Sequence, residues 1–420
     1  MLVFFTNMRS KSSGPRGLRL SLLVLAGFAV ALGLSAGLLW APAVQAAGFS
    51  DTASNPYHLQ IEVLSQLGII DGFADGTFRP NERVSRQQFA KMVDLAMRIP
   101  VSESDQSTFV DVAKTSGGNL YPDHYIAAAA KAAIVKGYPG ADGKLYFRPG
   151  NSITLAQVVT MSARASGRGL FVPPTTYHST WGNFDPDQAV IARVAQYNGL
   201  LRDLPLSTMS PWRNATRAEA AAILFNVMGT DPDGLNGRYL GDSTDLVRYF
   251  LSKHPEGGDF TVSIQQLAKY YVLIGKRFGI RADMAWAQMI HETGFGEYGG
   301  SVNAAQNNFA GIGATGPGVP GYSFKTAELG VIAQFAHLAW YTYPDHLDDP
   351  ACKLVSVPMS TVIDTPGDPR HLVINGKVHN GTVRKVEDLD GKWAVPGNGY
   401  GEAIKAMSVD IIQNFFTAGW

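Results

Sequence analysis

The sequence predicts a mainly α-helical protein with more than one domain. Its 420 residues exceed the roughly 100–200 residues of an ordinary domain, so two to four domains are expected. In the first half, three segments each pair a stretch of helical period with the start of a second helix. From Ile264 onward, apolar residues again recur at three- and four-residue spacing. Hydrophobic residues make up 45% of the chain, which is enough for packed cores and argues against wholesale disorder.

Composition excludes several classes of function. Lys and Arg together number 35, as do Asp and Glu, so the chain lacks the basic excess of a nucleic-acid-binding protein. The single cysteine, Cys352, excludes an intramolecular disulfide framework and any zinc site built on cysteines. No metal or cofactor site is predicted.

The basic residues are unevenly distributed at the N-terminus. Residues 1–46 contain no acidic residue and four basic ones, Arg9, Lys11, Arg16 and Arg19. An apolar run from Leu20 to Trp40 and the small-x-small end Val44-Gln45-Ala46 complete the pattern of a secretory signal peptide over 1–46. A retained membrane anchor is the alternative, because the apolar run is about long enough to span a bilayer. Cleavage would leave 31 Lys and Arg against 35 Asp and Glu, hence an exported protein of net charge −4 with no membrane segment.

Three degenerate repeats follow the signal peptide. Phe49-Ser50-Asp51 recurs as Phe109-Val110-Asp111 and, less clearly, as Phe184-Asp185. Each is followed by a helical stretch, a glycine turn and a polar loop, which ends in Phe-Arg-Pro in the first two copies. Each copy then opens a second helix with Ser or Thr and, three residues later, Gln or Glu, which is a capping box: Ser85 with Gln88, Thr154 with Gln157 and Thr216 with Glu219.

These motifs together resemble the S-layer homology (SLH) repeat. The resemblance covers residues 49–229 and gives repeats at 49–100, 105–167 and 180–229, of which the third is degenerate. It implies a three-pronged helical assembly that binds a secondary cell-wall polysaccharide. The family's ligand-binding arginine falls on Arg86 and Arg217, whereas the second copy has Leu155, so one of three grooves is expected to be weak or empty. A guanidinium suits an anionic sugar substituent, although a solvated arginine in a first helical turn is the alternative interpretation.

The turn-rich segment Asp231-Pro232-Asp233-Gly234 lies in a predicted linker over 230–244, which precedes a different region at 245–420. There, a helix is predicted from Arg281 to His291, with Glu292 at its end and Thr293-Gly294-Phe295-Gly296 directly after it. Helical spacing places Glu292 on a largely apolar face with Ala285, Gln288 and Met289, which would raise its pKa and suit a general acid. An exposed glutamate at a helix end is the alternative. A zinc-protease reading of His291-Glu292 fails, because the position of the second histidine holds Phe295.

The segments around Glu292 resemble a bacterial endo-β-N-acetylglucosaminidase family that cuts peptidoglycan. The resemblance rests on residues 287–296, 306–313, 330–338, 368–370, 391–394 and 399–401, and it covers roughly 245–420. It implies a lysozyme-like α+β domain, mostly helical, with a small β-hairpin, for which 306–313 is the candidate. It also implies Glu292 as the catalytic acid and a substrate cleft, for which the candidate residues are Asn308, Phe309, Gly311, Trp393 and Tyr400.

One departure from that family concerns the second catalytic group. Many members carry a tyrosine where this chain has Trp393, and an indole cannot serve as a phenolic acid or base. Glu328, Glu297 and Asp368 are the candidate second groups, each with a structural role as its alternative. The substrate's own acetamido group could instead act as the nucleophile.

The combined motifs predict a secreted peptidoglycan hydrolase that is held at the cell wall or S-layer by its repeats. Its expected partners are peptidoglycan strands as substrate and a secondary wall polysaccharide as anchor. Two alternatives stay open: a non-catalytic envelope protein that binds glycan, and a lytic transglycosylase with the same anchor.

Overall fold

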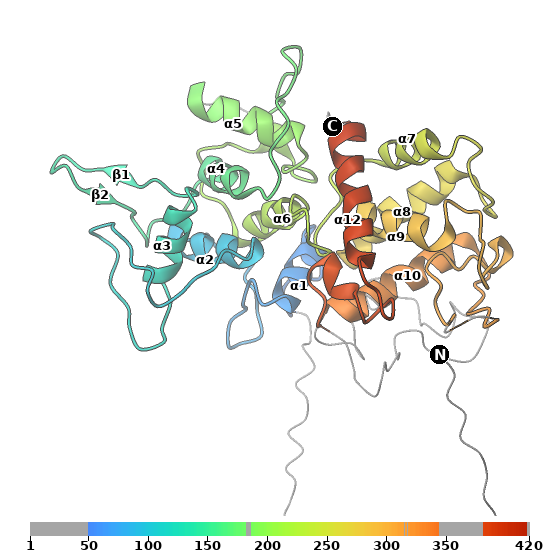
Figure 1. Cartoon of the computed structure of the whole chain (residues 1–420). Coiled ribbons are helices and arrows are strands. Elements are labelled where there is room, and N and C mark those ends of the chain that lie inside the picture. Colours follow the sequence, from blue (N-terminus) through green and yellow to red (C-terminus); the bar gives the residue numbers. More distant parts are fainter. Residues whose placement is uncertain (1–48, 182–185, 315, 317, 344–380, 418–420) are drawn as a thin grey trace, which may run out of the picture. The chain divides into compact units, whose positions relative to one another are not determined.

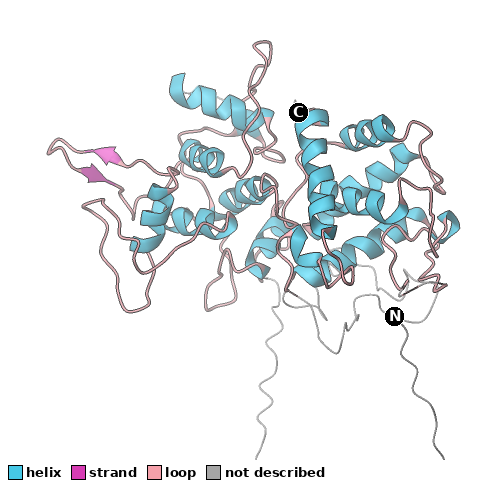
Figure 2. Ribbon diagram, in the orientation of Figure 1, coloured by secondary structure: helices cyan, strands magenta, loops and turns pink. Residues whose placement is uncertain are grey.

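A computed structural model describes residues 49–181, 186–314, 316, 318–343 and 381–417. The predicted signal peptide over 1–46, Cys352 and the candidate Asp368 lie outside these residues. Within them the protein is mainly helical, as expected from the sequence (Figure 2). The N-terminal repeats and the C-terminal region occupy successive stretches of the ribbon (Figure 1).

Each of the three segments of the repeat region contains two α-helices. Its elements are α1 (His58–Gln66), α2 (Arg86–Ala96), α3 (Asp123–Lys131), β1 (Tyr138–Pro139), β2 (Leu145–Tyr146), α4 (Leu155–Ala165), α5 (Pro186–Tyr197), η1 (Leu206–Thr208) and α6 (Arg217–Met228). All three predicted capping boxes form, at the starts of α2, α4 and α6. In each, the hydroxyl accepts from the backbone of the third helical residue, whose side chain accepts from the backbone of the cap residue, so two otherwise unpaired N–H groups are satisfied.

The starts of α2, α4 and α6 are joined in a closed ring. The first backbone N–H of each helix donates to a carbonyl in the loop before another of the three: Arg86 to Asn151 at 2.9 Å, Leu155 to Arg213 at 3.1 Å and Arg217 to Glu82 at 2.8 Å. Three isolated antiparallel bridges, between 85 and 152, 154 and 214, and 83 and 216, follow the same order. The three segments therefore meet around a pseudo-threefold axis, which the local sequence pattern alone does not specify.

The motif residues of the first two repeats close each repeat on itself. Asp51 accepts from the backbone N–H groups of Phe78 and Arg79 at 2.8 and 2.7 Å, and Asp111 accepts in the same way from residues 147 and 148. A Cβ at Gly72 would lie only 2.2 Å from the Phe49 ring, so the aromatic ring of the motif requires a glycine opposite it. The recurrence of Phe-x-Asp, glycine and Phe-Arg-Pro thus reflects one local packing arrangement.

The C-terminal region is a second helical assembly. Its elements are α7 (Ser243–Lys253), α8 (Ile264–Phe278), α9 (Ala282–Thr293), η2 (Ala304–Gln306), α10 (Ala327–Thr342), η5 (Val386–Leu389), α12 (Tyr400–Asp410) and the π-helical turn η6 (Ile411–Phe415). Helix α9 packs against α8 and α12, and α10 packs against α8. Trp286 and Trp340 are fully buried, which places them in the core rather than on a sugar-binding surface.

The prediction of a β-hairpin at 306–313 is wrong. Within the described residues, this segment is the end of η2 followed by turns, and the two-stranded sheet β1–β2 lies in the second repeat instead. Asn307, Gly311 and Gly313 all have positive φ, which interrupts an extended strand. The Asn308 side chain holds the loop in place of a strand ladder, because it bonds the backbone at Ile312 and Tyr322.

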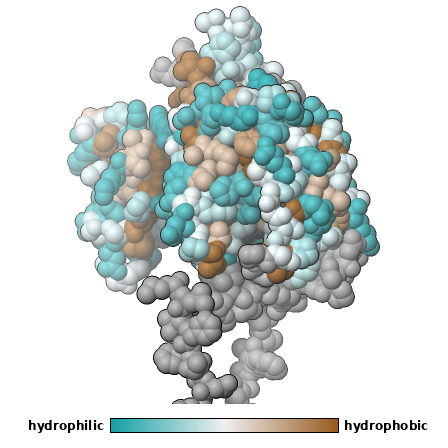
Figure 3. Space-filling view, turned by 45° about the vertical axis from the view of Figure 1, so that its right-hand side comes forward, coloured by the Kyte–Doolittle hydropathy of each residue, from teal (hydrophilic) through white to brown (hydrophobic). Residues whose placement is uncertain are grey.

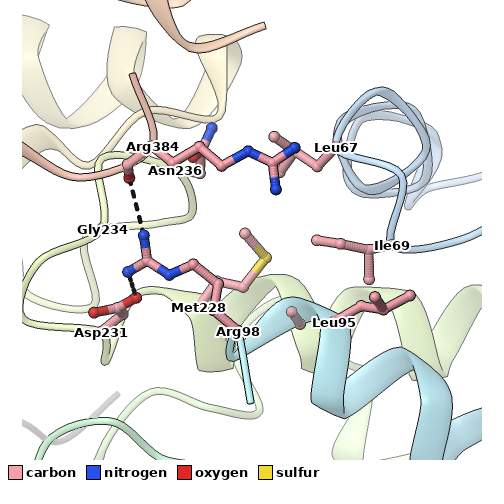
Figure 4. A pocket seen from close by; sticks show the side chains of 10 residues that line it. Leu67, Ile69, Leu95, Arg98, Met228, Asp231, Gly234, Asn236 and Arg384 are labelled. Carbon is pink, nitrogen blue, oxygen red and sulfur yellow. Dashed lines mark hydrogen bonds and ion pairs between the residues drawn. The ribbon is translucent and has the colours of Figure 1, made fainter. Parts of the chain in front are cut away.

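The segment that follows α6 is held by two arginines. Arg98, just after α2, pairs with Asp231 and donates to the carbonyl of Arg384 at 3.4 Å, beside a small apolar pocket (Figure 4). Arg281, before α9, is buried; it donates to the carbonyl of Asp231 and pairs with Asp283. The turn over 231–234 is therefore bonded from both sides.

The face shown in Figure 3 scatters hydrophobic residues among hydrophilic ones. The most exposed large apolar side chains come from separate elements, for example Val172, Trp212 and Val395. Among the helices described, none combines the length and apolarity needed to cross a bilayer.

Candidate functional site

The helix that carries Glu292 is anchored at both ends. At its start, Asp283 accepts a hydrogen bond of 2.6 Å from Ser408 of α12, and both residues are fully buried. At its end, the buried Thr293 bonds the carbonyl of Met289 and accepts from the backbone of Gly296, while Gly294 adopts the left-handed cap. The predicted helix is confirmed but ends two residues later, at Thr293, and Ala285, Gln288 and Met289 are buried on the face below Glu292.

Glu292 is half-buried, and two side chains donate to one oxygen of its carboxylate. The Trp393 indole N–H lies 3.1 Å from Oε1, and the Tyr400 hydroxyl makes a short hydrogen bond to the same atom. Tyr400 is the first residue of α12, and Trp393 lies in the turns just before this helix. Both donors therefore come from one short segment that is about 100 positions from Glu292 in the sequence. The other oxygen, Oε2, faces the loop at Gly311, where an added Cβ would lie 3.3 Å from it.

This environment favours the protonated carboxyl. Burial raises the pKa of Glu292 above its usual value, although the hydrogen bonds from Tyr400 and Trp393 act in the opposite direction. Burial and the neighbouring Glu292 raise the pKa of Tyr400 well above its usual range, so the phenol keeps its proton and acts as a donor. A carboxyl whose pKa is raised by burial, and whose second oxygen has no donor among the described residues, has the chemistry of a general acid.

Neither Glu297 nor Glu328, two of the candidate second carboxylates, makes a hydrogen bond to Glu292 among the described residues. Glu297 is exposed, and its nearest ionic partner is His254 at 3.8 Å. Glu328 lies in the first turn of α10, and neither it nor Glu297 is among the groups that shift the pKa of Glu292. Asp368 lies outside the residues described.

The five candidate substrate residues fall into two groups. Asn308 and Phe309 are buried, the first bonded to its own loop and the second packed against Phe260. Their burial indicates that Asn308 and Phe309 hold the loop that carries Gly311 in place. Gly311, Trp393 and Tyr400 border the Glu292 carboxylate itself.

The role of Tyr400 and Trp393 as donors to Glu292 is what sequence reasoning missed. The sequence predicts both as residues of a substrate cleft, but Tyr400 is only 6% exposed and its hydroxyl points at the acid. The ring of His291 packs edge-on against Tyr400, with the ring centres 5.1 Å apart. The sequence signal for these donors is Gln288, a polar residue one helical turn before Glu292 on an otherwise apolar face. Its side chain donates to the Tyr400 hydroxyl.

A second kind of site lies in the repeats. Arg86 of α2 reaches into a groove of the second repeat, which we call groove 2, bordered by Ile134, Tyr138, Gln157 and Met161. Its Nε donates to the carbonyl of Phe147 at 2.8 Å and its Nη1 to the Tyr138 hydroxyl at 3.0 Å. The guanidinium stacks 4.7 Å from the centre of the Phe147 ring.

Arg217 of α6 occupies the equivalent place in the first repeat, in a groove that we call groove 1, bordered by Ile70, Phe73, Lys91 and Met92. Its Nε donates to the carbonyl of Phe78 at 2.9 Å, and its Nη2 donates to the carbonyl of Asp71 at 2.8 Å. Each arginine is therefore supplied to a groove by a different repeat from the one that forms the groove.

The ring of helix starts relates Leu155, the position without an arginine, to the third segment, 180–229. Leu155 and Ala156 donate their backbone N–H groups to Arg213 and Pro211, as Arg86 and Gln87 do to Asn151 and Pro149. Leu155 is fully buried. The groove expected to lack its arginine is thus formed by the third segment, whereas groove 2 receives Arg86.

Comparison with known families identifies both regions. The S-layer homology domain matches residues 48–90 and 112–159, and the family described as mannosyl-glycoprotein endo-beta-N-acetylglucosaminidase matches residues 268–386. The two matches confirm the resemblances drawn from the motifs. The third segment, 180–229, is not part of the S-layer homology match.

Individual relatives share parts of the chain. An amylopullulanase of Thermoanaerobacterium thermosulfurigenes is 32% identical over 43% of this chain and 9% of its own length. S-layer protein EA1 of Bacillus anthracis is 35% identical over 25% of this chain and 11% of its own. An uncharacterized cell wall amidase of the same organism is 24% identical over 54% of this chain. The chain spans 39% of the length of that amidase. It therefore covers less than half of the length of each of these three relatives.

Proposed function

Because this chain belongs to the proteins that join an S-layer homology domain to a domain of the endo-β-N-acetylglucosaminidase family, we propose that it is a peptidoglycan hydrolase anchored at the cell wall. The reaction is hydrolysis of the β-1,4 bond on the reducing side of N-acetylglucosamine in the glycan strand. The observation that carries this proposal is the Glu292 carboxyl, whose pKa burial raises while Trp393 and Tyr400 hold it in place.

In the proposed mechanism, Glu292 protonates the glycosidic oxygen as the bond to the anomeric carbon breaks. The substrate's acetamido oxygen then closes on the anomeric carbon, and water later opens this intermediate with net retention. This route needs no second carboxylate from the protein, and Glu297, one of the candidates, is exposed and pairs with His254 instead. Inversion at the anomeric carbon would instead require a second carboxylate as base, for which Asp368 is then the first candidate.

The anchoring half of the proposal rests on grooves 1 and 2. Arg217 and Arg86, the latter only 6% exposed, each use Nε and one further nitrogen to fix the guanidinium, and the remaining nitrogen of each is the proposed donor to an anionic sugar substituent. The segment 180–229 acts as a third, degenerate repeat. Its support is the ring of equivalent backbone bonds, in which the Leu155 position makes the bond that an arginine residue makes in the other two.

The proposed location is the cell wall outside the membrane, reached through a signal peptide over residues 1–46. Binding of the repeats to wall polysaccharide would hold the hydrolase at high effective concentration beside its substrate. A secondary cell-wall polysaccharide is accordingly the proposed anchor, and peptidoglycan the proposed substrate.

Replacing Glu292 by Gln tests this proposal, because the amide keeps the shape of the side chain and cannot donate an acidic proton. The variant is expected to lose clearing of peptidoglycan in a gel while it still sediments with purified walls. Clearing by the variant would refute Glu292 as the acid. Wall binding by the wild type without any clearing would favour the alternative of a non-catalytic envelope protein.

A further inference from the structure

A hydrogen-bonded network of buried polar side chains lies below Glu292 in an otherwise apolar core. Tyr271 of α8 bonds Gln334 of α10, which bonds Gln288 of α9 at 2.9 Å. Gln288 in turn bonds the Tyr400 hydroxyl at 3.0 Å, and Tyr400 bonds Glu292. Each of the three residues below Glu292 and Tyr400 is at most 1% exposed. Burying a polar group without a hydrogen-bond partner costs free energy of folding, so each side chain of this network restricts the orientation of the next.

One backbone carbonyl determines which group donates in every hydrogen bond of this network. The amide group of Gln334 also lies 2.9 Å from the carbonyl oxygen of Ala285, which can only accept. That end of Gln334 must therefore be its NH₂ group, which also faces Gln288 Oε1. Its own oxygen then accepts from the hydroxyl of Tyr271.

The orientation of Gln334 also fixes the hydrogen bonds that lead to Glu292. Because Gln288 presents its oxygen to Gln334, its NH₂ group faces Tyr400 and donates to the phenolic oxygen. The phenolic hydrogen of Tyr400 is thereby directed to Glu292 Oε1. The Trp393 indole, which can only donate, points at the same oxygen.

We propose that Tyr400, Gln288 and Gln334 are positioning residues that reserve Oε1 of Glu292 as an acceptor and so assign the transferable proton to Oε2. An oxygen that accepts two hydrogen bonds is a poor site for a proton, whereas Oε2 has no donor among the described residues and faces Gly311. Gly311, with φ of 61°, keeps this face free of a side chain. This inference rests on the proposed role of Glu292 as the general acid.

Tyr400→Phe removes a donor that stabilises the ionised carboxylate, so Glu292 should hold its proton to higher pH. The alkaline limb of the kcat/KM profile for peptidoglycan fragments should then move up by about one pH unit, with a loss of about tenfold in kcat at the optimum. Gln288→Met, which leaves the phenol in place but unaligned, should shift the limb in the same direction by less.

Tyr343→Phe provides the matched control. Tyr343 is also a buried tyrosine of this domain, and its hydroxyl donates to the carbonyl of Phe278 at 2.8 Å, away from Glu292. This variant should lose thermal stability to a degree similar to Tyr400→Phe and leave the pH profile of kcat/KM where it is in the wild type. The unfolding temperature of every variant is measured in the same buffers, so that a loss of folding is recognised.

The outcomes separate the inference from the proposed function. If Glu292→Gln is inactive and folded Tyr400→Phe keeps the wild-type alkaline limb, the positioning role is refuted while the acid stands. If Glu292→Gln retains activity, the proposed function itself fails. An equal shift in Tyr400→Phe and Tyr343→Phe would also refute the inference, because it would reflect a general structural effect.

Discussion

Arg86 of the first repeat donates to the carbonyl oxygen of Phe147 in the second repeat, at 2.8 Å and across 61 positions of sequence. Groove 2 is therefore completed by a residue from a different repeat, and groove 1 is completed by Arg217 in the same manner. A loss of either arginine should consequently affect a groove that lies outside its own repeat.

Arg86→Ala and Arg217→Ala should each weaken binding to purified wall polysaccharide by about 10- to 100-fold, because a charge-assisted hydrogen bond contributes about 1.5–3 kcal/mol. The double variant should bind no better than the weaker single variant. Sedimentation with walls, or calorimetry with the isolated polysaccharide, measures the effect. Arg83→Ala is the matched control: this exposed arginine lies near the start of α2 and borders neither groove. Equal losses in all three variants would contradict the assignment of the two grooves.

Trp393→Phe should raise the pKa of Glu292 further, because the indole N–H stabilises the ionised carboxylate. The activity of a general acid is lost as pH rises through its pKa, so the alkaline limb of kcat/KM should move to higher pH. Trp393→Tyr supplies a hydroxyl from the same turn and should lie closer to the wild type. A shift to lower pH in Trp393→Phe would show that the indole does not act as a donor to the carboxylate.

Asp94 of α2 should make the stability of the protein fall as pH rises. The side chain is fully buried, neither carboxylate oxygen has a hydrogen-bond partner among the described residues, and burial together with the charge of Asp105 raises its pKa to about 8. Because the folded-state pKa lies above the unfolded value of about 3.9, the favourable contribution is complete below pH 4 and is lost as pH rises toward 8.

Asp94→Asn mimics the protonated carboxyl and should remove this pH dependence. The unfolding temperature of the variant, relative to the wild type, should be higher at pH 8 than at pH 5 by about 5 °C or more. Asp75→Asn is the control, because Asp75 is exposed and its pKa is lowered to about 2 by bonds to Thr77 and Arg79. A constant difference between Asp94→Asn and the wild type across this range would contradict the buried, unpaired carboxyl.

The sequence predicted local structure well where a short pattern determines it. The capping boxes at Ser85, Thr154 and Thr216, and the helix that ends at Glu292, depend on side chains within one or two turns. The hairpin at 306–313 was wrong, because polar and glycine-rich residues suit turns as well as strands and Asn307 adopts a left-handed conformation.

The remaining features depend on contacts across the chain. Which groove receives Arg86 is decided by the bonds between helix starts, such as Arg86 with Asn151, and no local pattern encodes that order. Likewise, Tyr400 meets Glu292 across 108 positions, and only the packing of α12 against α9 brings them together. The aromatic side chain could be identified from sequence, but the atom to which its hydroxyl donates could not.

The most direct test of the central claim is to digest purified peptidoglycan with the wild type and with Glu292→Gln and to identify the new chain ends by mass spectrometry. We predict that the wild type releases fragments with N-acetylglucosamine at the reducing end, and that Glu292→Gln releases none while it binds walls equally well. Anhydromuramic ends from the wild type would show a lytic transglycosylase instead. Continued release of N-acetylglucosamine ends by Glu292→Gln would contradict the account of the acid.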